Sequence, residues 1–159
     1  MTETSNLMEV KNVFKAFGED WGREKVVENL SLEIRRNQLT AIVGPSGCGK
    51  STVVNLLAGF ESPDSGQIMM EGEAVSGPSK DRLVVFQETA LMPWLNTYQN
   101  VTFGPKLRGD MPARSLKEAA DRIIDTVGLR EFKDKYPLQL SGGMQRRAEL
   151  ARALINQPL

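Results

Sequence analysis

Residues 39–60, LTAIVGPSGCGKSTVVNLLAGF, decide the fold of this chain. The apolar run at 39–43 predicts a buried strand, a glycine-rich turn follows it, and the next residues predict a helix that ends at Gly59. The turn matches the P-loop pattern G-x-x-x-x-G-K-[ST], which is specific when a strand precedes it and a helix follows. The residues that fill the fixed positions are Gly44, Gly49, Lys50 and Ser51.

The chemistry of phosphate binding explains this spacing. Glycines allow backbone conformations in which successive N–H groups point at phosphate oxygens, and a helix start adds unpaired N–H groups and a positive dipole end. Lys50 can reach the β- and γ-phosphates, and the Ser51 hydroxyl can ligate Mg²⁺. The sequence therefore predicts a nucleoside triphosphate site. Its residues are Gly44, Pro45, Ser46, Gly47, Cys48, Gly49, Lys50, Ser51 and Thr52.

Length and composition narrow the function classes. The 159 residues are one domain's worth of chain, and 20 basic residues balance 20 acidic ones, so no net charge favours nucleic acid or an anionic membrane. A single cysteine excludes a disulfide framework and suits a reducing compartment. No apolar run reaches the roughly 18 residues of a membrane span. We therefore expect a soluble intracellular chain whose membrane contacts are made through a partner.

Several strands are expected around the P-loop. Near-alternation at 7–17 suits an edge strand, and 30–35 alternates like a half-buried strand, so both should belong to a small antiparallel sheet. Residues 67–75 predict a hairpin around Gly72. The apolar run at 82–86 predicts a second buried strand, followed directly by Gln87.

Two residues near these strands are candidate ligand contacts. Gln87 would follow the carboxyl end of a strand, where α/β sheets place ligands, so its amide could contact Mg²⁺ or an attacking water. It could equally be an ordinary polar strand end. Phe17, just before a glycine, could stack on a purine base, or it could be a core or turn aromatic.

The second half of the chain has a helical pattern. Residues 91–95, LMPWL, are almost all large and apolar and show little periodicity. Such a segment suits either a partner contact or a loop folded over its own core. An amphipathic helix is expected after Pro112, closed by Gly128. Ser141 is placed to cap a last helix, whose start would be either a second anion site or a plain capped terminus.

The motifs taken together are far more specific than any one of them. The order of three motifs resembles the ATP-binding subunit of ABC transporters. These are the P-loop, then Gln87, and then Leu140-Ser141-Gly142-Gly143-Met144-Gln145. Nearly the whole chain, from residue 7 to 158, takes part in this resemblance. Residues 85–88 (VFQE) and 91–94 (LMPW), followed by Asn100, are similar to bacterial importer subunits for nitrate, sulfonate, taurine or related small anions.

The resemblance implies roles for residues at matching positions. Phe17 would stack on adenine, the P-loop would bind ATP with Mg²⁺, and Gln87 would contact Mg²⁺ and couple to a membrane-spanning permease that docks near residues 91–95. The signature motif would cover the ATP of a second ATP-binding subunit in a dimer, and the protein would be peripheral on the cytoplasmic face of the bacterial inner membrane. The residues implied in the signature motif are Ser141, Gly142, Gly143 and Gln145.

The resemblance also sets the expected architecture. It implies an α/β fold in a single domain over 1–159: a P-loop NTPase core, an N-terminal antiparallel β subdomain, and a helical signature-motif subdomain over about 90–156. Residues 146–149 depart mildly from the usual continuation of the motif. The strand carrying the catalytic acidic residues and the switch histidine of the family would lie beyond Leu159, so we expect this chain alone not to hydrolyse ATP. The alternatives are a non-hydrolysing nucleotide-binding remnant and a soluble ATPase of DNA or ribosomes, which the charge balance disfavours.

Overall fold

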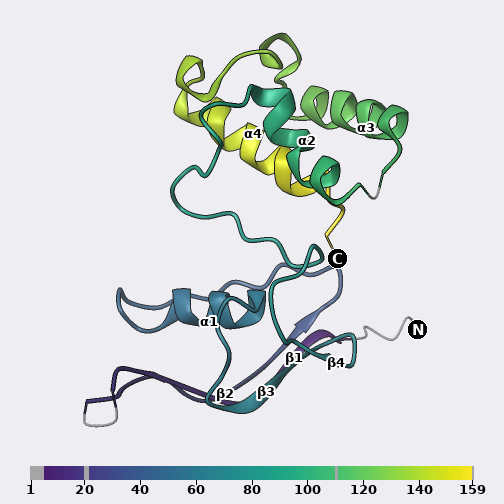
Figure 1. Ribbon diagram of the computed structural model, residues 1–159. Coiled ribbons are helices and arrows are strands. Elements are labelled where there is room, and N and C mark those ends of the chain that lie inside the picture. The colour runs from purple at the N-terminus through teal and green to yellow at the C-terminus, as the bar shows by residue number, and fades with distance from the viewer. Residues whose placement is uncertain (1–5, 20–21, 110, 159) are drawn as a thin grey trace. The chain divides into compact units, whose positions relative to one another are not determined.

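The computed structural model describes residues 6–19, 22–109 and 111–158, and the chain divides into two compact units, Met1–Ser79 and Lys80–Leu159 (Figure 1). The N-terminal unit is built on a sheet, and the C-terminal unit is built from helices. Each has its own buried apolar cluster. Among the described residues, no helix has both the length and the apolar character needed to cross a bilayer.

The sheet of the N-terminal unit is antiparallel and has four strands in the order β2-β1-β3-β4. The strands are β1 (Asn6–Phe17), β2 (Glu24–Arg35), β3 (Ser65–Met70) and β4 (Glu73–Ala74). The expected antiparallel sheet and hairpin are thus confirmed. The expectation of an edge strand at 7–17 is wrong, because β1 pairs on both sides, with Val10 opposite Leu32 of β2 and opposite Ile68 of β3. Alternation reports which face of a strand is buried and not how many neighbours the strand has.

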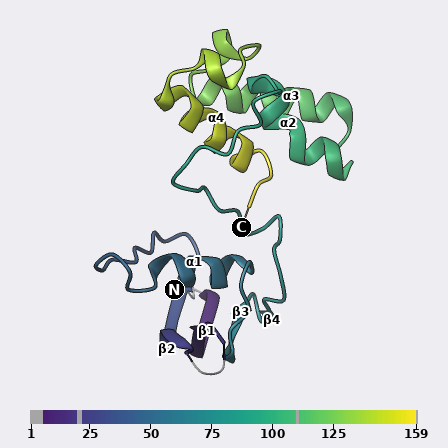
Figure 2. The same ribbon diagram turned by 60° about the vertical axis from the view of Figure 1, so that its left-hand side comes forward.

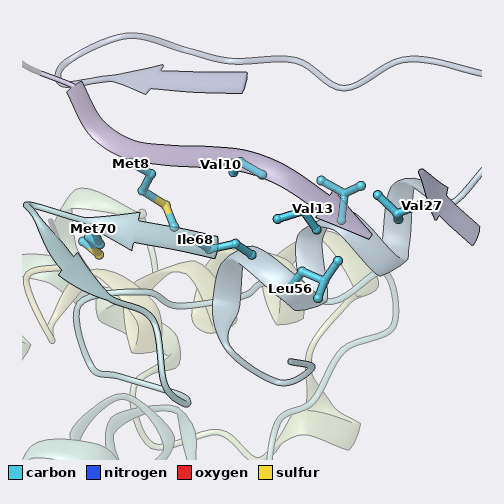
Figure 3. Close-up of a cluster of buried hydrophobic side chains, with 8 residues drawn as sticks. Met8, Val10, Val13, Val27, Leu56, Ile68 and Met70 are labelled. Atoms are coloured by element: carbon cyan, nitrogen blue, oxygen red, sulfur yellow. The ribbon is translucent and has the colours of Figure 1, made fainter. Parts of the chain in front are cut away.

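Helix α1 (Lys50–Ala58) follows the P-loop and covers one face of this sheet (Figures 1 and 2). Its apolar side inserts Val53 and Leu56 among strand residues, and the resulting cluster is drawn in Figure 3. The helix ends as predicted at Gly59, whose left-handed φ of 81° closes the last turn. The cluster contains Met8, Val10, Val13, Val27, Val53, Leu56, Ile68 and Met70.

Two predicted buried strands are absent from the described structure. Residues 39–43 are irregular and exposed, with Leu39 98% exposed, and residues 82–86 form no regular strand either. An isolated extended segment leaves its backbone N–H and C=O groups unpaired, so an apolar run becomes a buried strand only beside other strands. The described sheet consists of β1 to β4 alone, and none of these pairs with either run.

The C-terminal unit packs three helices around a second core (Figures 1 and 2). They are α2 (Thr97–Arg108), α3 (Ala113–Thr126) and α4 (Gly142–Leu154), with short 3-10 turns η1 (Arg130–Phe132) and η2 (Pro137–Gln139) between α3 and α4. The predicted helix after Pro112 and its closing Gly128, with φ of 68°, are confirmed. The predicted helix after Ser141 is confirmed as α4.

We expect Leu56→Ala to destabilise the N-terminal unit. Leu56 is fully buried between α1 and the sheet, so truncation removes apolar contacts and leaves a cavity worth about 2–5 kcal/mol of unfolding free energy. Urea denaturation followed by circular dichroism measures the loss. Val54→Ala on the same helix is the matched control, because Val54 is 39% exposed. Equal losses in both variants would contradict the packing described here.

Candidate functional site

The P-loop is an exposed backbone loop that leads into α1. Gly47 and Gly49 have φ of 82° and 87°, which other residues rarely adopt. A Cβ on Gly49 would lie 2.8 Å from the Val26 carbonyl oxygen, and one on Gly44 would lie 2.7 Å from the Cys48 sulfur. Gly49 is therefore required by a close backbone approach and by its backbone angle, and Gly47 by its backbone angle, whereas at Gly44 only the Cys48 side chain would have to move.

The start of α1 has the properties of an anion receptor. Its N-cap is Gly49, which has no side chain to accept a hydrogen bond from the first turn, and no acidic residue lies in that turn. The first N–H groups of a helix have no intrahelical partners, and here no side chain caps them. Ser51 lies exposed in the same turn, so a hard hydroxyl oxygen of the kind that Mg²⁺ prefers stands beside these donors.

The Lys50 side chain folds back over the loop. Its ammonium donates hydrogen bonds to the carbonyl oxygens of Gly44, at 2.9 Å, and Pro45, and lies 3.7 Å from the Cys48 sulfur. The two carbonyl partners carry no net charge, so the positive charge of Lys50 is not neutralised by them. A phosphate fits this arrangement, because it would replace neutral acceptors with negatively charged oxygens.

The N-terminal unit offers one side chain that could ligate Mg²⁺. Among the described residues, no group of three or more His, Cys, Asp or Glu side chains is placed to hold a metal. A Mg²⁺ that keeps waters and phosphate oxygens needs few protein ligands, and the Ser51 hydroxyl is available for one of these positions.

Phe17 is at the end of β1 and is 40% exposed, so it is not a core residue. The Lys15 ammonium lies 5.1 Å from its ring centroid, a cation–π contact. Lys15 is in turn held by the Ser62 carbonyl oxygen at 2.8 Å and by Glu61 at 3.3 Å. The ring is therefore fixed at a strand end and partly open to solvent, as a stacking residue requires.

Asp64 fixes the backbone beside Phe17. Its carboxylate accepts the N–H of Ala16 at 2.8 Å and a bond from Arg23 at 3.0 Å. The Ala16 N–H is the largest cause that lowers the pKa of Asp64, and the charges of Arg23 and Lys15 add to it, while burial acts in the opposite direction. The ionised carboxylate is thus the form that the folded chain favours.

Gln87 is not where the sequence predicted it. It is exposed and lies in a bend of the C-terminal unit, and the strand that was to place it does not form. The P-loop belongs to the other unit. The P-loop residues therefore belong to the N-terminal unit, whereas Gln87 and the signature motif both belong to the C-terminal unit.

The helix start at Ser141 differs from that of α1. The Ser141 hydroxyl accepts the N–H of Met144 at 3.3 Å, so this start carries its own cap. Gly142 and Gly143 are exposed, and a Cβ on either would meet nothing within 4 Å. The Gln145 amide nitrogen donates to the carbonyl oxygens of Pro137, at 2.9 Å, and Leu140, at 3.3 Å, which ties the turn before the helix to its first residues.

Segment 91–95 has one side chain that is exposed, as a partner contact requires, and one that packs on its own core. Trp94 is 71% exposed, whereas Leu91 packs against the core of its unit. Sequence reasoning gave no role to the Asn100 side chain, which is fully buried and holds the segment from within. Its oxygen accepts the Met92 N–H at 2.8 Å, and its nitrogen donates to the Leu95 carbonyl at 2.8 Å. These partners are near Asn100 in sequence, but they lie in an irregular loop, and no periodic pattern predicts the path of such a loop.

Comparison with known proteins identifies relatives over most of the chain. Residues 27–159 match the model of the protein family described as "ABC transporter". An uncharacterised ABC transporter ATP-binding protein of Methanocaldococcus jannaschii is 44% identical over 95% of this chain and 56% of its own length. The taurine import ATP-binding protein of Ruegeria pomeroyi is 45% identical over 84% of this chain and 50% of its own length. Other relatives are named for spermidine/putrescine and Fe(3+) ions import.

A solved structure confirms the fold class. This structure is the dimeric ATP-binding cassette MJ0796 bound to ADP and Pi in a post-hydrolysis state. It superposes on this chain with a TM-score of 0.81 at 30% sequence identity, and the match covers 95% of this chain and 70% of that one. The expected α/β P-loop fold with an antiparallel subdomain is that of this neighbour. The chain spans about half the length of the curated relatives it matches.

We expect the contribution of Asp64 to stability to depend on pH. Because its pKa is lowered on folding, its contribution is present above the unfolded value of about 4 and is lost as the pH falls through the lower folded value. Wild type should therefore be more stable than Asp64→Asn at pH 7, and the gap should close below about pH 4. Urea denaturation at pH 7 and at acid pH measures both. A gap that is unchanged at acid pH would contradict the assignment.

Proposed function

The chain belongs to the ABC transporter family, and from this we propose that it is the ATP-binding part of an importer subunit. The single observation that carries the proposal is the uncapped start of α1, with the Lys50 ammonium held in the loop by neutral groups. A nucleoside triphosphate supplies the negative charge that both features favour. Relatives named as ATP-binding proteins support ATP as the nucleotide.

Each P-loop residue has a physical role in this proposal. Backbone N–H groups of residues 46–52 bind phosphate oxygens, Pro45 having no N–H to donate, and Lys50 pairs with the β- and γ-phosphates. Ser51 supplies the hydroxyl for Mg²⁺, which when bound neutralises charge on the phosphates. Phe17 stacks on the adenine ring, a role supported by its fixed and partly exposed ring.

The C-terminal unit carries the other residues to which we assign a role. We propose that Gln87 contacts Mg²⁺ or the attacking water, and that the Ser141 helix start covers the nucleotide of a second subunit. A relative solved as a dimer with ADP and Pi supports this arrangement. Gly142 and Gly143 leave the approach to their N–H groups open, and Gln145 holds the turn in place. Hydrolysis by the complete subunit would then reopen the dimer.

The membrane partner would bind at Trp94. Exposed aromatic side chains beside a well-packed base are typical of binding hot spots, and Asn100 gives Trp94 such a base. We propose that a permease helix docks here, which would place the protein on the cytoplasmic face of the membrane.

A small anion such as taurine, nitrate or sulfonate is our proposal for the solute. The relative named for taurine supports it. Relatives named for polyamine and iron import show that the solute differs among proteins of similar sequence. A transport assay with the complete system and each solute in turn would decide between them.

We expect Lys50→Ala to lower ATP affinity at least about tenfold, because it removes a charge-assisted contact worth about 1.5–3 kcal/mol. Titration with a fluorescent ATP analogue measures the affinity. Lys117→Ala is the control, because Lys117 is an exposed lysine of α3 paired with Asp121. Unchanged affinity in Lys50→Ala would show that the P-loop is not the site.

We expect Trp94→Ala to weaken permease binding while leaving ATP affinity unchanged, because the ring is exposed and lies outside the P-loop unit. Co-purification with the permease and ATP titration measure the two effects. Leu138→Ala, another highly exposed apolar residue of the same unit, is the control. If Trp94→Ala instead unfolds the C-terminal unit, the residue belongs to its core.

A further inference from the structure

Glu149 is a buried carboxylate to which the proposed function assigns no role. It lies on α4 and is 3% exposed. One oxygen accepts the N–H of Ala90 at 3.1 Å, and the other accepts a bond from Arg146 at 2.9 Å. Arg152 lies 3.9 Å from the carboxylate on the next turn of the helix.

The same two arginines bind the segment that Glu149 contacts. Arg146 donates to the Phe86 carbonyl oxygen at 2.6 Å, and Arg152 donates to the Ala90 carbonyl oxygen at 2.7 Å. Between these points, the Thr89 hydroxyl donates to the Gln145 amide oxygen at 3.2 Å. Residues 86–90 have no regular secondary structure, yet both of their ends are bonded to α4. Gln87 lies between these ends and is exposed.

Burial alone does not favour a carboxylate at this position. A buried charge is costly to desolvate, and replacing a buried ion pair by well-packed apolar residues is often neutral or stabilising. The neighbouring buried positions of α4, Ala148 and Ala151, are apolar. The carboxylate adds directional bonds, because it accepts one guanidinium group and one backbone N–H at the same time, with a second guanidinium at ion-pair distance. The arrangement therefore fixes geometry more than it stabilises the core.

We propose that Glu149 is a positioning residue for Gln87. Through Ala90, Arg146 and Arg152, it holds the 86–90 segment on α4, so that the Gln87 amide is presented in one orientation. The proposal rests on the proposed role of Gln87 toward Mg²⁺. It also places the segment and the Ser141 helix start on one rigid element, because both are attached to α4.

The first test asks, without nucleotide, whether Glu149 holds the 86–90 segment on α4; we call this set of contacts the Glu149 clamp. Hydrogen exchange of the Ala90 amide, followed by NMR on the 159-residue chain, should be at least about tenfold faster in Glu149→Ala, because a bond to a charged acceptor is lost. Glu149→Gln keeps the shape and one acceptor oxygen but loses the charge, so it should give a smaller increase. Glu118→Ala, an exposed acid of α3, is the control and should leave Ala90 unchanged. Unchanged exchange in both Glu149 variants would overturn the proposal.

The second test separates positioning from a general loss of structure. ATP affinity is measured with Mg²⁺ and with EDTA, and the ratio reports the contribution of the metal. Glu149→Gln, which conserves volume, should lower this ratio by about tenfold, the lower end of the cost of losing an outer-shell partner. It should leave the affinity in EDTA unchanged. A fall of equal size with and without Mg²⁺ would show a structural role only.

A double-mutant cycle ties the effect to Gln87. If Glu149 acts through Gln87, the ratio for Gln87→Ala should not fall further when Glu149→Gln is added. Additive losses would overturn the proposal. Failure of the proposed function gives a different result. If the chain does not bind ATP, or if its ATP affinity is unchanged by Lys50→Ala, the proposed function is contradicted. Hydrogen exchange at Ala90 still decides, in that case, whether Glu149 holds the 86–90 segment.

Discussion

The packing of α1 against the antiparallel sheet is the contact on which the phosphate loop depends. Val53 and Leu56 anchor one side of the helix among β1, β2 and β3, so the helix cannot turn or slide without opening the core. Its first turn is thereby held at the end of a loop whose residues are otherwise exposed. The close approach of Gly49 to the Val26 carbonyl joins the same turn to β2. A rigid helix end is what allows N–H groups to act as a preorganised anion receptor.

The two helix starts that the sequence singled out are physically different. The start of α1 has no side-chain cap and a cationic side chain folded over it, whereas the start of α4 is capped by its own serine. An anion at α1 therefore gains donors that no side chain caps, but an anion at α4 must share or replace the Ser141 hydroxyl. This difference makes the start of α1 the stronger candidate for binding a nucleotide phosphate.

Local signals predicted the parts of the structure that local forces decide. The helix that follows the P-loop, the closing Gly59 and Gly128, and the Ser141 cap each involve only a few neighbouring residues, and each of these predictions is confirmed. The runs at 39–43 and 82–86 were predicted wrongly, because a strand exists only with a neighbour and periodicity cannot supply one. For the same reason the alternation at 7–17 wrongly predicts an edge strand, since it cannot show that β1 pairs on both sides. The buried role of Glu149 had no sequence signal, since its partner Ala90 lies on a distant segment. The partners of Asn100 are near it in sequence, but they lie in an irregular loop whose path no periodicity predicts.

Each unit determines the geometry of its own candidate residues. The P-loop and Phe17 depend on the sheet core, while Gln87, Trp94 and Ser141 depend on the helical core. A change in one core therefore disturbs one set of contacts and leaves the other set intact. Within the helical unit, the contacts of Glu149 with Ala90 and Arg146 tie the backbone on either side of Gln87 to α4, so the orientation of Gln87 depends on that helix.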